Sequence, residues 1–233
     1  MYVLIMELNE PENNLSDAEP KKKSRKEREH ERKRDEILDA AEKLFFSQGY
    51  EQTTIQDIAS AAEFAKGTIY LYFSAKAEIY LAIINRSLDI AYEMLTKSID
   101  STATGGEQLR EAFRGFIDFL NQYPDYFKMW LYGQRYVDEK LYLEHPLGQQ
   151  CRQKEMSLMM YNMNSIMKGL ADGSIQSASP PPLIAMTFLV FNRGLHQFLL
   201  ENGDKVISMY GVNREQLVQQ METVLCKGLG ITI

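Results

Sequence analysis

Residues 53–73 read TTIQDIASAAEFAKGTIYLYF and carry the clearest structural pattern in the sequence. Its apolar spacing predicts two short helices, over residues 55–61 and 65–73, joined by a tight turn at 62–64. Thr54 supplies a hydroxyl at the N-cap of the first helix. Two short helices in this order form a helix-turn-helix, whose second helix enters the major groove of DNA.

The second of these helices has two unlike faces. Ile69 and Phe73 lie four residues apart and point inward, because this spacing keeps two side chains on one helical face. Gly67, Thr68 and Leu71 fall on the opposite, outward arc, which tyrosines flank. A small, polar and aromatic outer face suits contact with base edges, and the glycine permits close approach of the backbone.

The remaining segments also have the apolar periodicity of helices, and no segment of the sequence alternates with the period of two that marks a strand. We therefore predict an all-α protein. One further helix is expected to end at Gly49, before the helix-turn-helix. After it we expect helices over residues 75–100 and 107–122, one starting at Pro124, a methionine-rich one ending near Leu170, and two over residues 183–200 and 214–227.

The N-terminal region has a strong charge asymmetry. The 233 residues carry a net charge of −6, yet residues 1–19 hold five acids and no base. Residues 20–34 hold nine bases against three acids. Taken alone, this basic run is equally well explained as a solvated lead-in to a helix or as a flexible arm that tracks DNA phosphates. Its position just before the helix-turn-helix favours the arm.

The composition excludes several classes of protein. Hydrophobic residues make up 45% and charged residues 25%, as in ordinary globular proteins. Cys151 and Cys226 form neither a disulfide framework nor a metal-ligand cluster, and no phosphate loop or nucleophile motif is present in the sequence. We expect no enzyme, no cofactor and no metal. The two cysteines without a disulfide framework favour a reduced, cytoplasmic location. The apolar stretch 183–200 contains Asn192 and Arg193, which favours a buried helix over a membrane span.

The segments 53–59 and 65–73, followed by Lys76, resemble the TetR family of bacterial transcriptional regulators. The resemblance is close from about Asp35 to Tyr80, where spacing, turn and helix lengths agree. It implies an obligate homodimer that binds double-stranded DNA at a palindromic operator and holds a small-molecule effector in its C-terminal domain. The resemblance assigns two sets of residues to DNA binding. The base contacts are Lys66, Gly67, Thr68, Tyr70 and Leu71, and the phosphate contacts are Thr54, Tyr72 and Lys76.

Two positions depart from the family pattern. Ala65 stands where a serine often caps the second helix, and the missing cap costs about 0.5–2 kcal/mol of local helix stability. Glu63 and Phe64 stand in the turn where a small residue and valine are common. We expect the Glu63 carboxylate to lower affinity for phosphate.

The resemblance organises the chain into three parts: a disordered tail at 1–24, a DNA-binding domain at 25–80, and an effector-binding and dimerisation domain at 81–233. Aromatic and methionine side chains crowd the third part and suit a pocket for a hydrophobic or aromatic effector, although each alone is equally a core residue. The pocket candidates are Phe113, Phe116, Trp130, Met156, Met160, Met163, Asn162, Phe188 and Asn192.

The resemblance places the dimer interface in the helices at 183–200 and 214–227. These helices can instead belong to the core of one chain, and sequence does not separate the two possibilities. We interpret Arg193 and His196 as interface or solvent-edge residues. The interface candidates are Leu189, Arg193, His196, Leu217, Met221 and Val224.

The sequence thus predicts a homodimeric, ligand-responsive regulator, with a repressor favoured. Two alternatives remain at this point. One is a helical small-molecule-binding protein whose DNA domain is vestigial, and the other is a transcriptional activator on the same fold.

Overall fold

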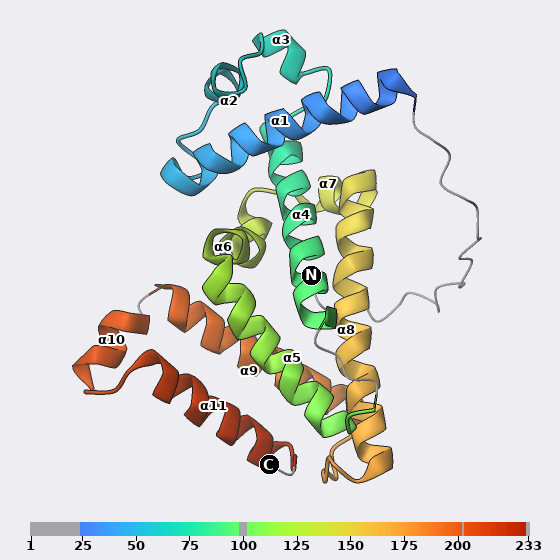
Figure 1. Cartoon of the computed structure of the whole chain (residues 1–233), viewed down its shortest axis with the longest axis vertical. Helices are drawn as coiled ribbons and strands as arrows, with labels where there is room; N and C mark the ends of the chain where they lie inside the picture. Colours follow the sequence, from blue (N-terminus) through green and yellow to red (C-terminus); the bar gives the residue numbers. More distant parts are fainter. Residues whose placement is uncertain (1–23, 98–101, 202, 232–233) are drawn as a thin grey trace. The chain divides into compact units, whose positions relative to one another are not determined.

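The computed structural model describes residues 24–97, 102–201 and 203–231, and over these ranges its regular structure is helical (Figure 1). One isolated bridge pairs Ile175 with Ile231. The predicted all-α fold is confirmed. The elements are α1 (Arg25–Gln48), α2 (Ile55–Ala61), α3 (Lys66–Ile69), α4 (Lys76–Lys97), α5 (Gly105–Gln122), α6 (Pro124–Tyr132), η2 (Gly133–Arg135), α7 (Glu139–Glu144), α8 (Pro146–Asp172), α9 (Pro181–Glu201), α10 (Gly203–Met209) and α11 (Arg214–Gly228).

The chain divides into two compact units between Ile79 and Tyr80, near the start of α4. The first unit contains α1 to α3 with the first residues of α4, and the second contains the remaining helices. Because α4 crosses the division, a single continuous helix belongs to both units.

The core of the first unit is small and apolar. Leu38 of α1, Ile58 of α2 and Ile69 of α3 are buried, and Phe73 closes the core after α3. The inward orientation expected for Ile69 and Phe73 is therefore confirmed. Burying these side chains fixes which face of α3 is left outside.

Helix α1 is longer than expected and starts inside the basic run. The Ser24 hydroxyl accepts a hydrogen bond from the Glu27 backbone, 3.2 Å, and the Glu27 carboxylate accepts one from the Ser24 backbone, 2.6 Å. This capping box begins the helix at Arg25. The flexible arm expected over residues 20–34 is thus wrong from Arg25 onward, whereas the tail predicted at 1–24 lies outside the described residues except for Ser24.

Several other helix boundaries also differ from those expected. Helix α3 ends at Ile69 rather than near Phe73, because the Tyr72 and Phe73 backbone N–H groups both donate to the Ile69 carbonyl in a closing turn. The short helices α7 and α10 were not predicted from sequence.

In the second unit α5 crosses α8 at a glycine contact. The helix expected from residue 107 begins earlier, because Thr104 caps it and Gly105 and Gly106 lie in its first turn. A Cβ atom on Gly105 would lie 2.0 Å from the backbone nitrogen of Gly169 in α8. The glycines therefore allow the two helix backbones to touch, rather than interrupting the chain.

Candidate functional site

The turn between α2 and α3 is tight and carries backbone strain. Ala62 ends α2, and Glu63 then adopts a left-handed conformation with φ of 58°. Its backbone N–H donates to the Ser60 carbonyl, 3.2 Å. Ala65 caps α3 and makes no side-chain hydrogen bond to the helix, as its methyl group requires. The turn thus combines a left-handed residue at Glu63 with a helix start that lacks a side-chain cap at Ala65.

We expect Glu63→Gly to raise the free energy of unfolding by about 1 kcal/mol, because glycine adopts positive φ without the steric cost that a Cβ atom imposes. Urea titration monitored by circular dichroism measures this. Glu63→Ala is the matched control, since it removes the same carboxylate and keeps the Cβ atom. An equal gain in both variants would mean that charge, and not backbone conformation, sets the cost.

The outward side of α3 and the turn after it is exposed. Leu71 is 78% exposed and Tyr70 is 49% exposed. Lys66 and Gly67 are also exposed, and a Cβ atom on Gly67 would meet no atom within 4 Å. Thr68 is half-buried. The structure thus gathers the predicted base-contacting residues on one accessible surface of the first unit.

The three residues expected to contact phosphates are more constrained. The Thr54 hydroxyl accepts from the Asp57 backbone, 3.1 Å. The Thr54 backbone N–H and hydroxyl each donate to the Asp57 carboxylate at 2.8 Å, and these bonds hold the pKa of that carboxyl below its usual range. Tyr72 is half-buried, with its ring 4.5 Å from that of His30. These groups already have partners within the first unit.

Lys76 is held most firmly of the three. Its ammonium group donates to the carbonyls of Tyr50, 2.7 Å, and Thr53, 2.8 Å, and lies 4.0 Å from the centre of the Tyr50 ring. Partial burial lowers the pKa of Lys76. One ammonium proton remains for another acceptor. Lys76 therefore positions the chain before α2 as well as carrying a charge that a phosphate can approach.

Exposed cations from the basic run lie along the first turns of α1. Arg25, Lys26, Arg28 and Arg32 are exposed, and Arg32 pairs with Glu29 on the same helix. These cations therefore lie at fixed positions along a helix and do not belong to a flexible segment. The first unit thus presents both a contact surface on α3 and a row of cations on α1.

In the second unit aromatic residues from α5 and α6 pack together. The rings of Phe116 and Trp130 stack at 6.4 Å with 7° between their planes, and Phe127 meets Trp130 edge to face at 5.6 Å. Phe113 and Phe188 are buried in the core of the unit. Of the pocket candidates, the structure joins Phe116 and Trp130 directly and places Phe113 and Phe188 as core residues.

The methionine stripe of α8 is only partly internal. Met160 is exposed, whereas Met156 and Met163 are half-buried. Asn162, on the same helix, has a buried side-chain oxygen without a hydrogen-bond partner. Met160 on this helix therefore points away from the core of the chain, and the half-buried residues are those that can line an internal site.

His196 was wrongly expected at an interface or solvent edge. Its side chain is 2% exposed, and its ring lies 5.0 Å from that of Phe127 and 6.0 Å from that of Phe116. Burial lowers the pKa of His196 to about 3, with a smaller contribution from the Arg214 charge. Arg193 is half-buried as well, and it donates to the Leu131 carbonyl at 3.4 Å. Both residues belong to the inner half of α9.

Glu155 is a polar residue that the sequence interpretation missed. Its carboxylate accepts hydrogen bonds from the Trp130 indole, 3.0 Å, and from the Tyr142 hydroxyl. Burial raises its pKa, and the hydrogen bonds with the nearby charges of Arg152 and Arg193 oppose that effect. One signal was available in sequence: Glu155 follows the apolar Cys151 by four residues, which puts both on one face of α8.

The outer face of α9 is apolar and exposed. Val190 is 62% exposed, and Leu183, Met186 and Phe198 on the same side are also exposed. By length and composition α9 could cross a membrane, and 33% of its most apolar segment is buried within the chain. The buried polar residues on its inner side argue against a span. Exposed apolar faces are typical of surfaces that bind another molecule.

The dimer candidates therefore lie on different faces of their helices. Leu189 is half-buried, like Arg193, and His196 is internal. On α11 Leu217 and Met221 are half-buried and Val224 is exposed. The exposed apolar residues of α9 are Leu183, Met186, Val190 and Phe198, and we call the surface that they form the α9 face.

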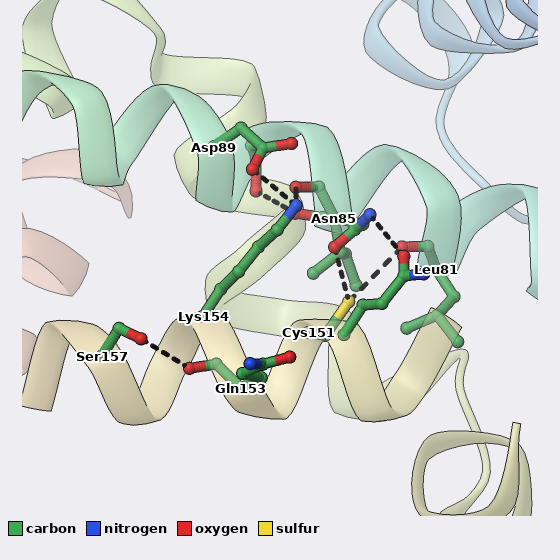
Figure 2. A network of polar contacts seen from close by, with 10 residues as sticks. Leu81, Asn85, Asp89, Cys151, Gln153, Lys154 and Ser157 are labelled. Carbon is green, nitrogen blue, oxygen red and sulfur yellow. Dashed lines mark hydrogen bonds and ion pairs between the residues drawn. The ribbon is translucent and has the colours of Figure 1, made fainter. Parts of the chain in front are cut away.

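Figure 2 shows a polar network that joins α4 to α8. The Lys154 ammonium group forms an ion pair with Asp89 and donates to the Asn85 carbonyl, 3.2 Å. The Asn85 amide donates to the Gln150 side chain, 3.3 Å, and the Cys151 thiol lies 3.8 Å from the Leu81 carbonyl. These contacts fix the middle of α4 against α8.

Known proteins resemble the chain, some of them over most of its length. Residues 37–83 match the family described as bacterial regulatory proteins, tetR family. The uncharacterised HTH-type transcriptional regulator YfiR of Bacillus subtilis is 30% identical over 206 residues, which cover 85% of this chain and 95% of YfiR. The HTH-type transcriptional activator FasR of Mycolicibacterium smegmatis is 29% identical over 107 residues, 46% of this chain and 48% of FasR.

A solved structure agrees with the fold. The regulator FadR of Bacillus subtilis in complex with stearoyl-CoA superposes with a TM-score of 0.65 at 20% identity, covering 82% of this chain and 96% of FadR. The family match lies on the helix-turn-helix, and the YfiR match extends through both units. The chain belongs to the tetR family of bacterial regulatory proteins and is a helix-turn-helix transcriptional regulator.

Proposed function

We propose that the chain acts in the cytoplasm as a homodimeric repressor that releases a palindromic operator when a small, largely hydrophobic or aromatic effector binds. The observation that carries the proposal is the outer surface of α3. Lys66, Gly67, Tyr70 and Leu71 are exposed there, while Ile69 and Phe73 hold the element in place from inside. A surface of this kind has no role in packing the first unit, and it matches what major-groove readout needs.

We assign DNA binding to residues 25–80, and effector binding and dimerisation to residues 81–233. The division of the chain between Ile79 and Tyr80 supports this assignment. Base contacts fall to Lys66, Gly67, Thr68, Tyr70 and Leu71, and phosphate contacts to Thr54, Tyr72 and Lys76 with the cations of α1. Because the Thr54 and Lys76 side chains also have internal partners, we assign them a second role, which is to position the backbone at the start of α2.

We expect the double variant Lys66→Ala with Tyr70→Ala to weaken operator binding by about a hundredfold or more, because a base-reading side chain contributes about 1–3 kcal/mol. Selection from a randomised DNA pool supplies the operator, and fluorescence anisotropy at fixed salt measures the affinity. Both side chains are exposed, so the free energy of unfolding stays unchanged.

Lys205→Ala is the control for the loss of one positive charge, since Lys205 is exposed on α10 in the second unit. Equal affinity of the wild type and the double variant for the selected DNA would support the alternative in which the helix-turn-helix is vestigial.

Dimerisation is assigned to the α9 face. Leu183, Met186 and Val190 leave a continuous apolar strip on α9, and Gly194 next to them leaves space for a second helix to approach. A twofold interface places the same strip of both copies together. We therefore propose that the α9 face of one copy of this chain packs against the α9 face of a second copy.

Val190→Glu tests this interface. We expect the dissociation constant of the dimer to rise about a hundredfold or more, because two carboxylates would be buried without partners at the twofold contact. Analytical ultracentrifugation measures the change. Gln122→Glu, at an exposed position in α5, adds the same charge elsewhere and should leave the dimer intact. A Val190→Glu protein that stays dimeric would move the interface off this face.

The effector is assigned to the second unit, between the aromatic residues of α5 and α6 and the inner half of α9. Because FadR carries stearoyl-CoA in its structure, fatty acids and their coenzyme A thioesters are the first compounds to screen. We propose that the effector displaces α4 through its network with α8, which changes the operator spacing of the two subunits. A coupling of about 1–3 kcal/mol suffices for such a switch.

Transcription in vitro from the selected operator separates repression from activation. The relative FasR is an activator by name, so the activator alternative stays open. A rise in transcript when effector is added to the operator complex would support repression. A rise on adding the protein itself would support activation.

A further inference from the structure

The inner side of α9 carries two polar residues in an otherwise apolar environment. Asn192 is 5% exposed and His196 is 2% exposed, and they lie four residues apart. At this spacing both side chains leave the same face of the helix, one turn from each other. Most helix positions as deeply buried as these are filled by hydrocarbon.

Each of these two side chains has a polar atom without a hydrogen-bond partner in the protein. The Asn192 amide nitrogen donates to the Phe188 carbonyl of its own helix, 2.8 Å, but its side-chain oxygen is buried without a partner. The Nε2 atom of His196 is likewise buried without a partner. Native interiors rarely leave such atoms unpaired, because each one forfeits the hydrogen bonds it makes in water. A second copy of the chain cannot supply the missing partner, since both atoms lie beneath the surface.

Two further features define what can bind here. The rings of Phe116 and Phe127 flank the His196 imidazole, and Trp130 stacks on Phe116. Arg214 at the start of α11 also has a buried Nε atom without a partner, and its charge acts on His196. The imidazole itself is neutral near pH 7, because burial lowers the pKa of His196 to about 3. The surroundings are therefore aromatic, with a neutral ring and one cation as possible donors.

We propose that Asn192, His196 and Arg214 form the polar end of the effector site, which takes a carboxyl or carbonyl oxygen at the head of an apolar molecule. This inference rests on the proposed function, in which the second unit binds the effector. Arg214 and His196 donate hydrogen bonds to the oxygen head, and Asn192 accepts one from a protonated or hydroxylated head. The aromatic rings contact the carbon chain beside it. A head with a positive charge is rejected by Arg214.

Trp130 provides a direct readout, because it is the single tryptophan of the chain and stacks on Phe116 beside the proposed site. The full-length protein is titrated with straight-chain fatty acids from hexanoic to octadecanoic acid, while indole fluorescence is recorded. The alcohol and the amine of the best chain length follow, and then its coenzyme A thioester. We expect saturable binding of the acid or the thioester, weaker binding of the alcohol, and none of the amine.

Two variants test the named residues. His196→Leu and Asn192→Leu each remove one unpaired polar atom, and we expect each to weaken binding of the acid or thioester about tenfold. Tyr161→Phe in α8 is the matched control, since it also removes a buried polar atom without a hydrogen-bond partner, and it should leave the affinity unchanged. Thermal denaturation of each variant confirms that it is folded.

Unchanged affinity in both leucine variants would overturn the proposal and mean that water satisfies these atoms. Absence of saturable binding across the whole series would overturn it as well. If the acid binds through Asn192 and His196 but leaves operator affinity unchanged, the site stands and its role as the effector switch fails. Operator binding by the ligand-free protein tests the regulator function separately.

Discussion

Gly105→Ala should destabilise the second unit by about 3 kcal/mol, because the new methyl group would have no space at the crossing of α5 and α8. The added Cβ atom would lie 2.0 Å from the Gly169 nitrogen and 2.3 Å from the Ser165 carbonyl oxygen. Both are backbone atoms, so no rotation of a side chain relieves the overlap. The two helices must separate, and the hydrogen bond from the Gly105 N–H to the Asp172 carboxylate, 2.9 Å, is stretched with them.

Gly106→Ala is the matched control, one residue further along the same turn. Its Cβ atom would approach the Ser174 carbonyl oxygen at 3.0 Å and the Ile231 side chain at 3.1 Å. Small adjustments accommodate these contacts, and alanine favours the helix by about 1 kcal/mol over glycine. We expect a net change within about 1 kcal/mol. Chemical denaturation of both variants measures the difference in the free energy of unfolding. Equal losses of stability would mean that separating the helices at Gly105 costs little free energy.

These two glycines illustrate what sequence alone could not provide. In a single sequence, Gly105-Gly106 is a helix breaker, and the local propensity of glycine supports that interpretation. The opposite outcome depends on Gly169, more than sixty residues later, whose own lack of a side chain makes the close crossing possible. Such a contact is non-local, so no window of sequence reveals it.

The first unit was predictable because its signals are local. Thr54 and Asp57 cap α2 as their spacing requires, and Ile69 and Phe73 point inward as their spacing also requires. What failed there was the conformation of the basic run. Helix formation from Arg25 depends on the Ser24–Glu27 capping box, a weak local signal inside a strongly charged segment.

The second unit was predictable as a set of helices but not as a site. The inward face of α9 comprises Phe188, Asn192 and His196, so His196, which was expected at an interface or solvent edge, lies inside. A hydrophobic pattern cannot anticipate this, because it assigns polar residues outward by construction. The same reasoning explains why Glu155 was missed. Polar residues on an inner face are identified by packing, and they are the strongest candidates for ligand recognition in this unit.

The burial of His196 has a consequence for stability that can be measured. The pKa of His196 is about 3 in the folded chain, against about 6.5 in an unfolded chain. On acidification, His196 is therefore protonated in the unfolded state at a pH where it is still neutral in the folded state. Stability contributed by the neutral imidazole is fully present above pH 6.5 and is lost as the pH falls toward 3.

We expect the wild type to lose about 2 kcal/mol more than His196→Gln between pH 7 and pH 5, since each pH unit below the unfolded pKa contributes about 1.4 kcal/mol. Urea denaturation at several pH values measures the difference. The Glu155 carboxyl acts with the opposite sign, because a raised pKa favours the folded state as the pH falls, but it is common to both proteins and cancels. Asn192→Leu perturbs the same part of α9 and should keep the wild-type slope. Parallel pH profiles for the wild type and His196→Gln would mean that the imidazole is protonated inside the folded chain, with a counter-charge or water reaching it.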